Sequence, residues 1–234
     1  MKVLALVPAR AGSKRIKNKN IKKLNGKPLI CYVIDELKKS KLVDKVVVST
    51  DSKQIANIAK KNGAEVPFIR PKKISGDKSL VIDTVTYNLD RFKKENEYVP
   101  DYVLLVQPVN PFISSKQIDS AIRLAYSKKA DSVVSVVEVD TTSHPFNIRV
   151  VSGKGTVRFW KGREHYNFLG KEKQKFYRLG NLIISSYDTI KKEGRLEGKK
   201  NYFIEIDKIS GIDIDDLEDF LIAESIMISK QIKK

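Results

Sequence analysis

The chain has 234 residues, of which 41% are hydrophobic, and this content is enough for one sizeable buried core. It carries 45 Lys and Arg residues against 28 Asp and Glu residues, which gives a formal net charge of +17 at pH 7. The single cysteine, Cys31, excludes an internal disulfide, and the absence of a long apolar run or a signal-peptide pattern disfavours a membrane-spanning or secreted protein. We expect one domain over residues 1–234, located in the cytoplasm.

Strand-like and helix-like segments alternate over the first 140 residues. The strands are read from short runs rich in Val, Leu and Ile, and the helices from apolar residues at helical spacing. In chain order the predicted elements are a strand over 2–9, a helix over 28–40, a strand over 45–51, a helix over 52–64 with Ser52 as N-cap and Gly63 as its stop, an extended segment over 65–71, a helix over 79–96, a strand over 101–108, a helix over 114–129 and a strand over 130–140. This alternation predicts an α/β fold with a mostly parallel sheet covered by helices on both faces.

The pattern changes after Asp140. Turn signals and alternating apolar positions, without a long helical pattern, predict inserted β-hairpins over 140–180, and inserted hairpins often serve as subunit contacts. Strand and helix then return over 180–194, 200–207 and 213–231. Asp215 or Asp216 is the predicted N-cap of the last helix.

The charges are unevenly distributed along the chain. Residues 1–30 contain nine basic side chains and no acidic one, whereas residues 204–224 contain eight acidic side chains and one basic side chain, Lys208. If folding brings these segments together, a polyphosphate could lie on the first while a divalent cation bridges it to the second. Nucleic-acid binding, which the net charge alone would suggest, would not require the acidic segment.

The loop after the first strand is a candidate phosphate site, because ligands of open α/β sheets bind beyond the carboxyl ends of the strands. Gly12 allows a tight turn whose amide groups can face phosphate oxygens, and Arg10, Lys14 and Lys19 can donate charge-assisted hydrogen bonds. The loop has neither P-loop spacing nor a dinucleotide-binding fingerprint. Judged on spacing alone, a generic basic loop explains it equally well.

Five motifs follow the predicted strands in a fixed order: GSK with KNKNI at 12–21, VSTD at 48–51, RP with GDKS at 70–79, QPVNP at 107–111 and DID at 213–215. Together they resemble the cytidylyltransferases that activate nonulosonic acids, namely CMP-sialic acid synthetases and their pseudaminic and legionaminic acid relatives, over nearly the whole chain. The resemblance implies a Rossmann-like nucleotidyltransferase fold, a three-layer sandwich in which the inserted hairpins of 140–180 form a dimerisation subdomain. It also implies CTP and a nine-carbon sugar acid as substrates, Mg²⁺ as cofactor, and a homodimer whose hairpins reach into the partner's site.

The resemblance carries roles over to individual residues on the nucleotide side. Arg10 and Lys19 would hold the triphosphate and take part in catalysis, with Gly12 and Ser13 lining the loop and Asn20 beside the nucleotide. Arg70 and Ser79 would recognise cytosine and its neighbourhood, and Asp77 would shape the GDKS turn between them.

On the sugar side, the residues that the resemblance assigns to the sugar acid are Gln107, Arg178, Tyr202 and Phe203. Asp213 and Asp215 would bind Mg²⁺, and because they alternate on an extended segment, both carboxylates are expected to project to one side. The anomeric hydroxyl would attack the α-phosphorus of CTP in line, and pyrophosphate would leave. Asp213, taken as catalytic, or a metal-bound water could accept the hydroxyl proton. No covalent intermediate is needed, so Cys31 is predicted to be buried and inert.

Departures from the sialic acid pattern leave the sugar acid open. Asn147 stands where sialic acid enzymes tend to have a lysine, and Ile184 stands where a tyrosine is expected. His144 is predicted to be a turn residue, and His165 has no predicted partner. Two alternatives remain: a nucleotidyltransferase for another sugar, such as a Kdo-activating or UTP-using enzyme, and a non-catalytic basic nucleic-acid-binding module on the same scaffold.

Overall fold

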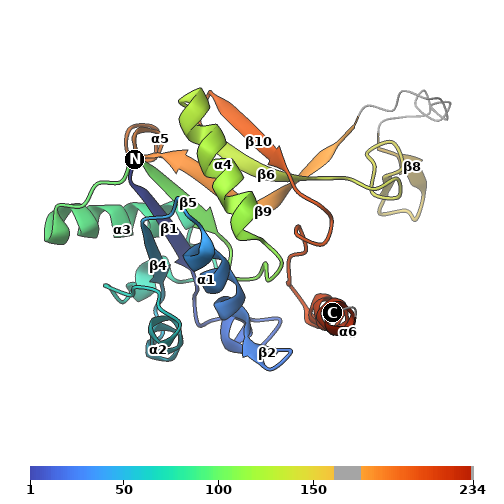
Figure 1. Ribbon diagram of the computed structural model, residues 1–234. Helices are drawn as coiled ribbons and strands as arrows, with labels where there is room; N and C mark the ends of the chain where they lie inside the picture. Colours follow the sequence, from blue (N-terminus) through green and yellow to red (C-terminus); the bar gives the residue numbers. More distant parts are fainter. Residues whose placement is uncertain (161–174, 233–234) are drawn as a thin grey trace.

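A six-stranded sheet forms the centre of the computed structural model, which describes residues 1–160 and 175–232 (Figure 1). In sheet order the strands are β10 (Asn201–Glu205), β6 (Ser132–Glu138), β9 (Tyr177–Ser186), β5 (Tyr102–Val106), β1 (Val3–Pro8) and β4 (Lys45–Ser49). β1 pairs in parallel with β4 and β5, and β6 pairs in parallel with β10, whereas β9 runs antiparallel to β5 and β6. The predicted mostly parallel sheet is confirmed.

Helices cover both faces of this sheet. One face packs against α1 (Leu29–Lys39), α2 (Lys53–Lys61) and α4 (Ser115–Lys128), and the other packs against α3 (Val81–Asn96) and α5 (Tyr187–Glu193). Strand β1 shows the reason, because successive residues of a strand point to opposite faces. Val3, Ala5 and Val7 face the first layer, Leu4 and Leu6 face the second, and all five are fully buried. A strand buried on both sides needs the continuous apolar run seen in the sequence.

The helix boundaries agree with the capping signals. Ser52 accepts a hydrogen bond from the backbone of α2, Ser114 does the same for α4, and Gly63 after α2 has a positive φ of 84°. Helix α6 (Leu217–Ile232) starts after Asp216, whose Oδ1 accepts from the backbone N–H of Asp219 at 3.0 Å. Asp216, rather than Asp215, is therefore the cap. Among the described helices, none is long and apolar enough to span a membrane.

The predicted insertion contains an antiparallel hairpin of β7 (Arg149–Val151) and β8 (Val157–Phe159), which lies away from the central sheet in Figure 1. Strand β9 already pairs with β6 at Tyr177, so the expected boundary at 180 falls inside the central sheet. His144 is buried against the rings of Phe146 and Phe176, with centroid distances of 4.9 and 5.0 Å. Residues 161–174, which include His165, lie outside the described residues.

Short elements connect the basic segment to the C-terminal helix. After the 3₁₀ helix η1 (Lys19–Ile21), strands β2 (Lys23–Leu24) and β3 (Lys27–Pro28) form a hairpin whose turn residues, Asn25 and Gly26, both have positive φ. Helix α6 packs on this hairpin and on the start of α1 through an apolar cluster of Leu24, Leu29, Ile214, Phe220, Ala223 and Met227. This packing brings the acidic segment that precedes α6 beside the basic segment.

The site is set by the order of the strands around β1. β4 and β5 flank β1 on opposite sides, and the helices α1 and α3 that lead to them lie on opposite faces of the sheet. A crevice forms between the loops at such a switch point. The loops after β1 and β5 leave the same edge of the sheet here, because Leu6 pairs with Leu105 near the ends of the two strands.

Candidate active site

A cleft of about 510 Å³ lies over the carboxyl ends of β1 and β5. Residues from the loop after β1, the loop after β5, strand β9 and the acidic segment line it together. They are Pro8, Arg10, Ser13, Lys14, Arg15, Ile16, Lys19, Asn20, Gln107, Pro108, Val109, Asn181, Asp213 and Asp215. The predicted convergence of the basic and acidic segments is therefore present in the structure.

A smaller cavity of about 200 Å³ adjoins this cleft. Its lining includes Arg70, Asp77 and Ser79, the residues predicted on the cytosine side, together with Gly76 and Thr84. The cavity and the cleft share Pro8, Arg10 and Gln107 as lining residues. Arg10 and Gln107 therefore stand at the junction of two connected chambers.

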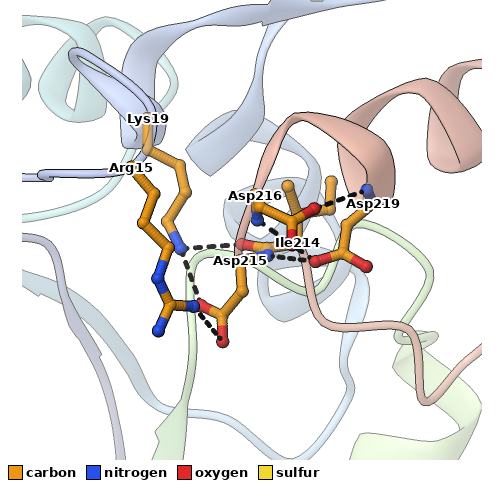
Figure 2. Close-up of polar contacts among 6 residues, drawn as sticks. All are labelled: Arg15, Lys19, Ile214, Asp215, Asp216 and Asp219. Atoms are coloured by element: carbon orange, nitrogen blue, oxygen red, sulfur yellow. Dashed lines mark hydrogen bonds and ion pairs between the residues drawn. The ribbon is translucent and has the colours of Figure 1, made fainter.

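Figure 2 shows how the basic segment meets the acidic one. Lys19, whose side chain is only 14% exposed, donates from Nζ to the backbone oxygen of Ile214 at 2.7 Å and to Asp215 Oδ1 at 3.1 Å. Arg15 points at the same carboxylate, with Nη1 3.4 Å from Asp215 Oδ2 (Figure 2). Asn20, which is 5% exposed, donates from Nδ2 to the backbone oxygen of Arg10 at 2.9 Å. This hydrogen bond holds the two ends of the basic loop after β1 together.

Asp77 pairs with two further cations of the basic loop, Arg10 and Lys14. Its carboxylate lies 2.6 Å from Arg10 Nη1 and 2.5 Å from Lys14 Nζ. Hydrogen bonds from Lys14 and Arg10 hold the pKa of Asp77 below its usual value. A phosphate that binds these cations must open or share both ion pairs, so the positive charge of the loop is already oriented by carboxylates before any anion arrives.

Arg70 is held inside the smaller cavity. It is 5% exposed, and its guanidinium donates from Nε to Ser75 Oγ and from Nη1 to Thr84 Oγ1, each at 3.0 Å. Burial lowers its pKa, because the charged form loses contact with water. Ser79 Oγ accepts from the backbone N–H of Gly76 at 3.1 Å and so closes the turn that carries Asp77.

Asp213, which lines the cleft, has an unpaired carboxylate oxygen. Its Oδ1 is buried and has no hydrogen-bond partner among the described residues, although buried polar atoms are nearly always paired. Burial, with the nearby charge of Asp215 added, raises the pKa of Asp213 to about 6, and Lys19 opposes this shift. In the described part of the chain no three His, Cys, Asp or Glu residues form a metal cluster. The unpaired carboxylate oxygen of Asp213 and the neighbouring Asp215 suit Mg²⁺, which is commonly held by one or two carboxylates plus substrate phosphates.

The burial of Asp213 predicts how stability depends on pH in the absence of divalent metal. Its pKa is about 6 in the folded protein against an ordinary 3.8, so folding disfavours the charged carboxylate. The resulting penalty is absent below the ordinary pKa, grows as pH rises toward the folded pKa, and is complete above it. We therefore expect Asp213→Asn, in EDTA at pH 8, to have a free energy of unfolding about 1 to 2 kcal/mol higher than wild type, since partial solvent contact reduces the full effect.

Urea unfolding of both proteins at pH 8 and near pH 4 measures this difference, which should be much smaller at the lower pH, close to the ordinary pKa of 3.8. An Asp213→Asn protein that is less stable than wild type at pH 8 contradicts this account of the buried carboxylate.

The residues predicted to contact the sugar acid are not all brought to the cleft. Gln107 lines both chambers, and Arg178 in β9 donates from Nη2 to the backbone oxygen of Gly211 at 2.8 Å, beside the acidic segment. Tyr202 and Phe203 lie on the edge strand β10, 36% and 56% exposed, and Phe203 contacts the ring of Tyr177 with centroids 6.1 Å apart. Within the described part of the chain, Arg178, Tyr202 and Phe203 line neither chamber.

Sequence reasoning missed two polar residues that line the cleft, Arg15 and Asn181. Arg15 belongs to the basic block but was not singled out, and Asn181 follows Gly180 inside a strand where an apolar residue would be expected. The buried Nδ2 of Asn181 has no hydrogen-bond partner among the described residues.

Two other predictions concern residues of the core. Ile184, which stands where sialic acid enzymes are expected to have a tyrosine, is fully buried, so this difference affects core packing rather than the sugar side. Cys31 is 1% exposed, and burial raises the pKa of its thiol, so the predicted buried thiol is confirmed.

The fold and the cleft define a doubly wound α/β protein whose polar site sits at the topological switch point. The chain belongs to the cytidylyltransferase family, because residues 4–154 match the model of the family described by that name. A solved structure of a CMP:2-keto-3-deoxy-manno-octonic acid synthetase complexed with CTP superposes with a TM-score of 0.74, covering 98% of this chain and 100% of that one. At 15% identity, this likeness confirms the nucleotidyltransferase fold and nothing finer.

Two curated relatives are closer in sequence. The CMP-N,N'-diacetyllegionaminic acid synthase of Legionella pneumophila is 44% identical over 136 residues, which is 58% of each protein. The N-acylneuraminate cytidylyltransferase of Escherichia coli is 30% identical over 234 residues, which is 100% of this chain and 54% of that protein. The chain thus spans somewhat more than half the length of these relatives.

Proposed function

We propose that the chain is a cytidylyltransferase that activates a nine-carbon, nonulosonic sugar acid with CTP and releases pyrophosphate. The observation that supports this most strongly is the single cleft in which Arg10 and Lys19 face Asp213 and Asp215. Family membership and the printed activities of the two curated relatives point in the same direction. The legionaminic acid relative, at 44% identity, makes legionaminic acid the first sugar acid to test.

The reaction is an in-line displacement. The anomeric hydroxyl oxygen of the sugar acid forms a bond to the α-phosphorus of CTP. The bond from that phosphorus to the oxygen bridging the α- and β-phosphates breaks, and pyrophosphate leaves with the electron pair of that bond. Arg10 and Lys19 would bind the triphosphate, with Gly12 and Ser13 lining the loop, and stabilise the charge that develops. The carboxylate of Asp213 is the chain's candidate for accepting the hydroxyl proton. Mg²⁺ held by Asp213 and Asp215 would neutralise phosphate charge when bound.

The two chambers suit the two parts of the nucleotide. We assign the cavity around Arg70, Asp77 and Ser79 to cytosine and its neighbourhood, with Asn20 close to the nucleotide on the cleft side. Arg10 at the junction would then contact the phosphates, which connect the base side to the cleft. Gln107, at the same junction, would meet the sugar acid.

We further propose a homodimer, to which the remaining sugar residues would contribute. Arg178, Tyr202 and Phe203 lie beside or outside the cleft of their own chain, so Tyr202 and Phe203 would reach a sugar acid only across a subunit interface. Exposed apolar side chains near Phe203 support such an interface: the ring of Tyr177 lies 6.1 Å from that of Phe203, and Leu179, two residues further along β9, is 54% exposed. The expected cytoplasmic location stays a prediction.

Pyrophosphate release from each of the four nucleoside triphosphates, with Mg²⁺ and a panel of sugar acids, tests the proposal. The panel contains legionaminic, pseudaminic and N-acetylneuraminic acids together with Kdo. We expect release with CTP and at least one nonulosonic acid only. Release with Kdo alone, or with UTP, would favour the alternative nucleotidyltransferases, and no release together with salt-sensitive binding of nucleic acid would favour the non-catalytic module.

A further inference from the structure

The segment that carries Asp213 and Asp215 is irregular, so its position must be set by contacts with other elements. Three side chains from three different parts of the chain donate to its backbone oxygens. Asn110 Nδ2 donates to Ser210 at 2.8 Å, Arg178 Nη2 donates to Gly211 at 2.8 Å, and Lys19 Nζ donates to Ile214 at 2.7 Å. The segment is also pressed against β6, since a Cβ at Gly211 would collide with Val137.

Asn110 differs from the other two donors in burial and charge. It is fully buried, at 0% exposure, and it is uncharged. Its Oδ1 accepts from the backbone N–H groups of Phe112 at 3.2 Å and Ile113 at 3.1 Å, which leaves Nδ2 directed at Ser210. One amide therefore fixes the loop after β5 and the acidic segment to each other.

A neighbouring backbone contact runs along the same junction. The N–H of Ile214 donates to the backbone oxygen of Val109 at 3.1 Å, and Val109 lines the cleft. Asp213 lies between the two tethered positions, Ser210 and Ile214. Its carboxylate is thus placed in the cleft by a frame that the loop after β5 supplies.

Lys19 and Arg178 would lose their hold on the segment when they turn to an anionic substrate, because both are cations assigned to substrate groups. Asn110 is not expected to bind a substrate, because it is fully buried and does not line the cleft. We propose that Asn110 is a positioning residue for the cation site: it keeps Asp213 and Asp215 in place while Lys19 and Arg178 engage the substrates. This inference rests on the proposed function, because it assumes that those carboxylates bind a divalent cation.

Partners that orient metal-binding carboxylates typically change metal affinity by about 10- to 100-fold when they are removed. Asn110→Ser keeps a hydroxyl that can accept from Ile113 but leaves nothing that reaches Ser210. We expect it to weaken Mn²⁺ binding to the protein saturated with CTP, in which Lys19 would engage the triphosphate, by about 10-fold or more, measured by electron paramagnetic resonance with Asp213→Asn as the reference for a lost site. The Mg²⁺ concentration for half-maximal pyrophosphate release should rise by a similar factor, and saturating Mg²⁺ should restore most of kcat.

Asn88→Ser is the matched control. Asn88 is 1% exposed and, like Asn110, donates from Nδ2 to a backbone oxygen, that of Thr84 at 2.8 Å. It also donates to Ser49 Oγ at 2.9 Å, and neither partner belongs to the acidic segment. Its replacement should lower stability comparably and leave Mn²⁺ affinity unchanged. Asn110→Asp, which keeps the acceptor for Phe112 and Ile113 and loses the donor, is the second variant if Asn110→Ser does not fold.

Mn²⁺ affinity that is unchanged in the Asn110 variants, or weakened equally in Asn88→Ser, overturns the positioning role. If that happens while wild type releases pyrophosphate from CTP, only the role of Asn110 fails. If wild type neither binds Mn²⁺ through Asp213 nor turns over CTP with any sugar acid, the proposed function fails with it.

Discussion

Asp213→Asn should lower kcat/KM for pyrophosphate release from CTP by about 1,000-fold or more, which corresponds to about 4 kcal/mol of lost transition-state stabilisation. The reason is the unpaired, buried Oδ1 of Asp213 inside the cleft, which an amide cannot replace as a negatively charged ligand. The folded state should remain intact, because removing the charge relieves the burial penalty. Initial rates over a range of CTP concentrations at saturating Mg²⁺, with circular dichroism as the folding check, measure the effect.

Asp216→Asn is the control for this variant. It removes the same charge three residues further on, yet it preserves the start of α6, since Asn and Asp are equivalent helix caps. Its activity should stay within about threefold of wild type, as expected for an exposed carboxylate. Similar losses in both variants would mean that the net charge of the segment matters and that Asp213 has no individual role.

Lys19→Met should have the second-largest effect, a loss of about 100- to 1,000-fold in kcat/KM. Methionine keeps most of the apolar length of the side chain but removes the ammonium that lies between Ile214 and Asp215. We expect a larger fall in kcat than rise in KM for CTP, because charge on the phosphates grows toward the transition state. Initial rates over a range of CTP concentrations separate the two parameters.

Lys17→Met provides the comparison, because Lys17 belongs to the same basic loop but is exposed and, in the described structure, is not among the residues that line the cleft. It should change kcat/KM by no more than about threefold at physiological salt. A Lys17→Met loss as large as that of Lys19→Met would show that the loop acts through its overall positive potential.

The strands and helices of this fold could be predicted from the sequence because short stretches of neighbouring residues determine them. A continuous apolar run predicted β1, which is buried on both faces, and Ser52 predicted the start of α2. The meeting of the N-terminal and C-terminal segments was also predicted, from charge complementarity together with the position of loops at strand ends. The structure gives the packing reason, since α6 docks on the β2–β3 hairpin next to the basic loop.

Features that depend on contacts between distant residues were not readable. The hydrogen bond from Asn110 joins positions 100 residues apart, and no local pattern marks a buried asparagine as a tether. The ion pairs of Asp77 with Arg10 and Lys14 are another example, because the sequence assigned Asp77 only to the shape of its own turn. The early start of β9 at Tyr177 was missed because polar residues alternate there, as they do in the inserted hairpins.

A crystal structure of the protein with CTP and Mn²⁺, in which anomalous scattering identifies the cation, tests the central claim most directly. We expect one Mn²⁺ coordinated by Asp213 and by phosphate oxygens of a nucleotide whose triphosphate contacts Arg10 and Lys19. A nucleotide bound elsewhere, or a cation that contacts neither Asp213 nor Asp215, would contradict it.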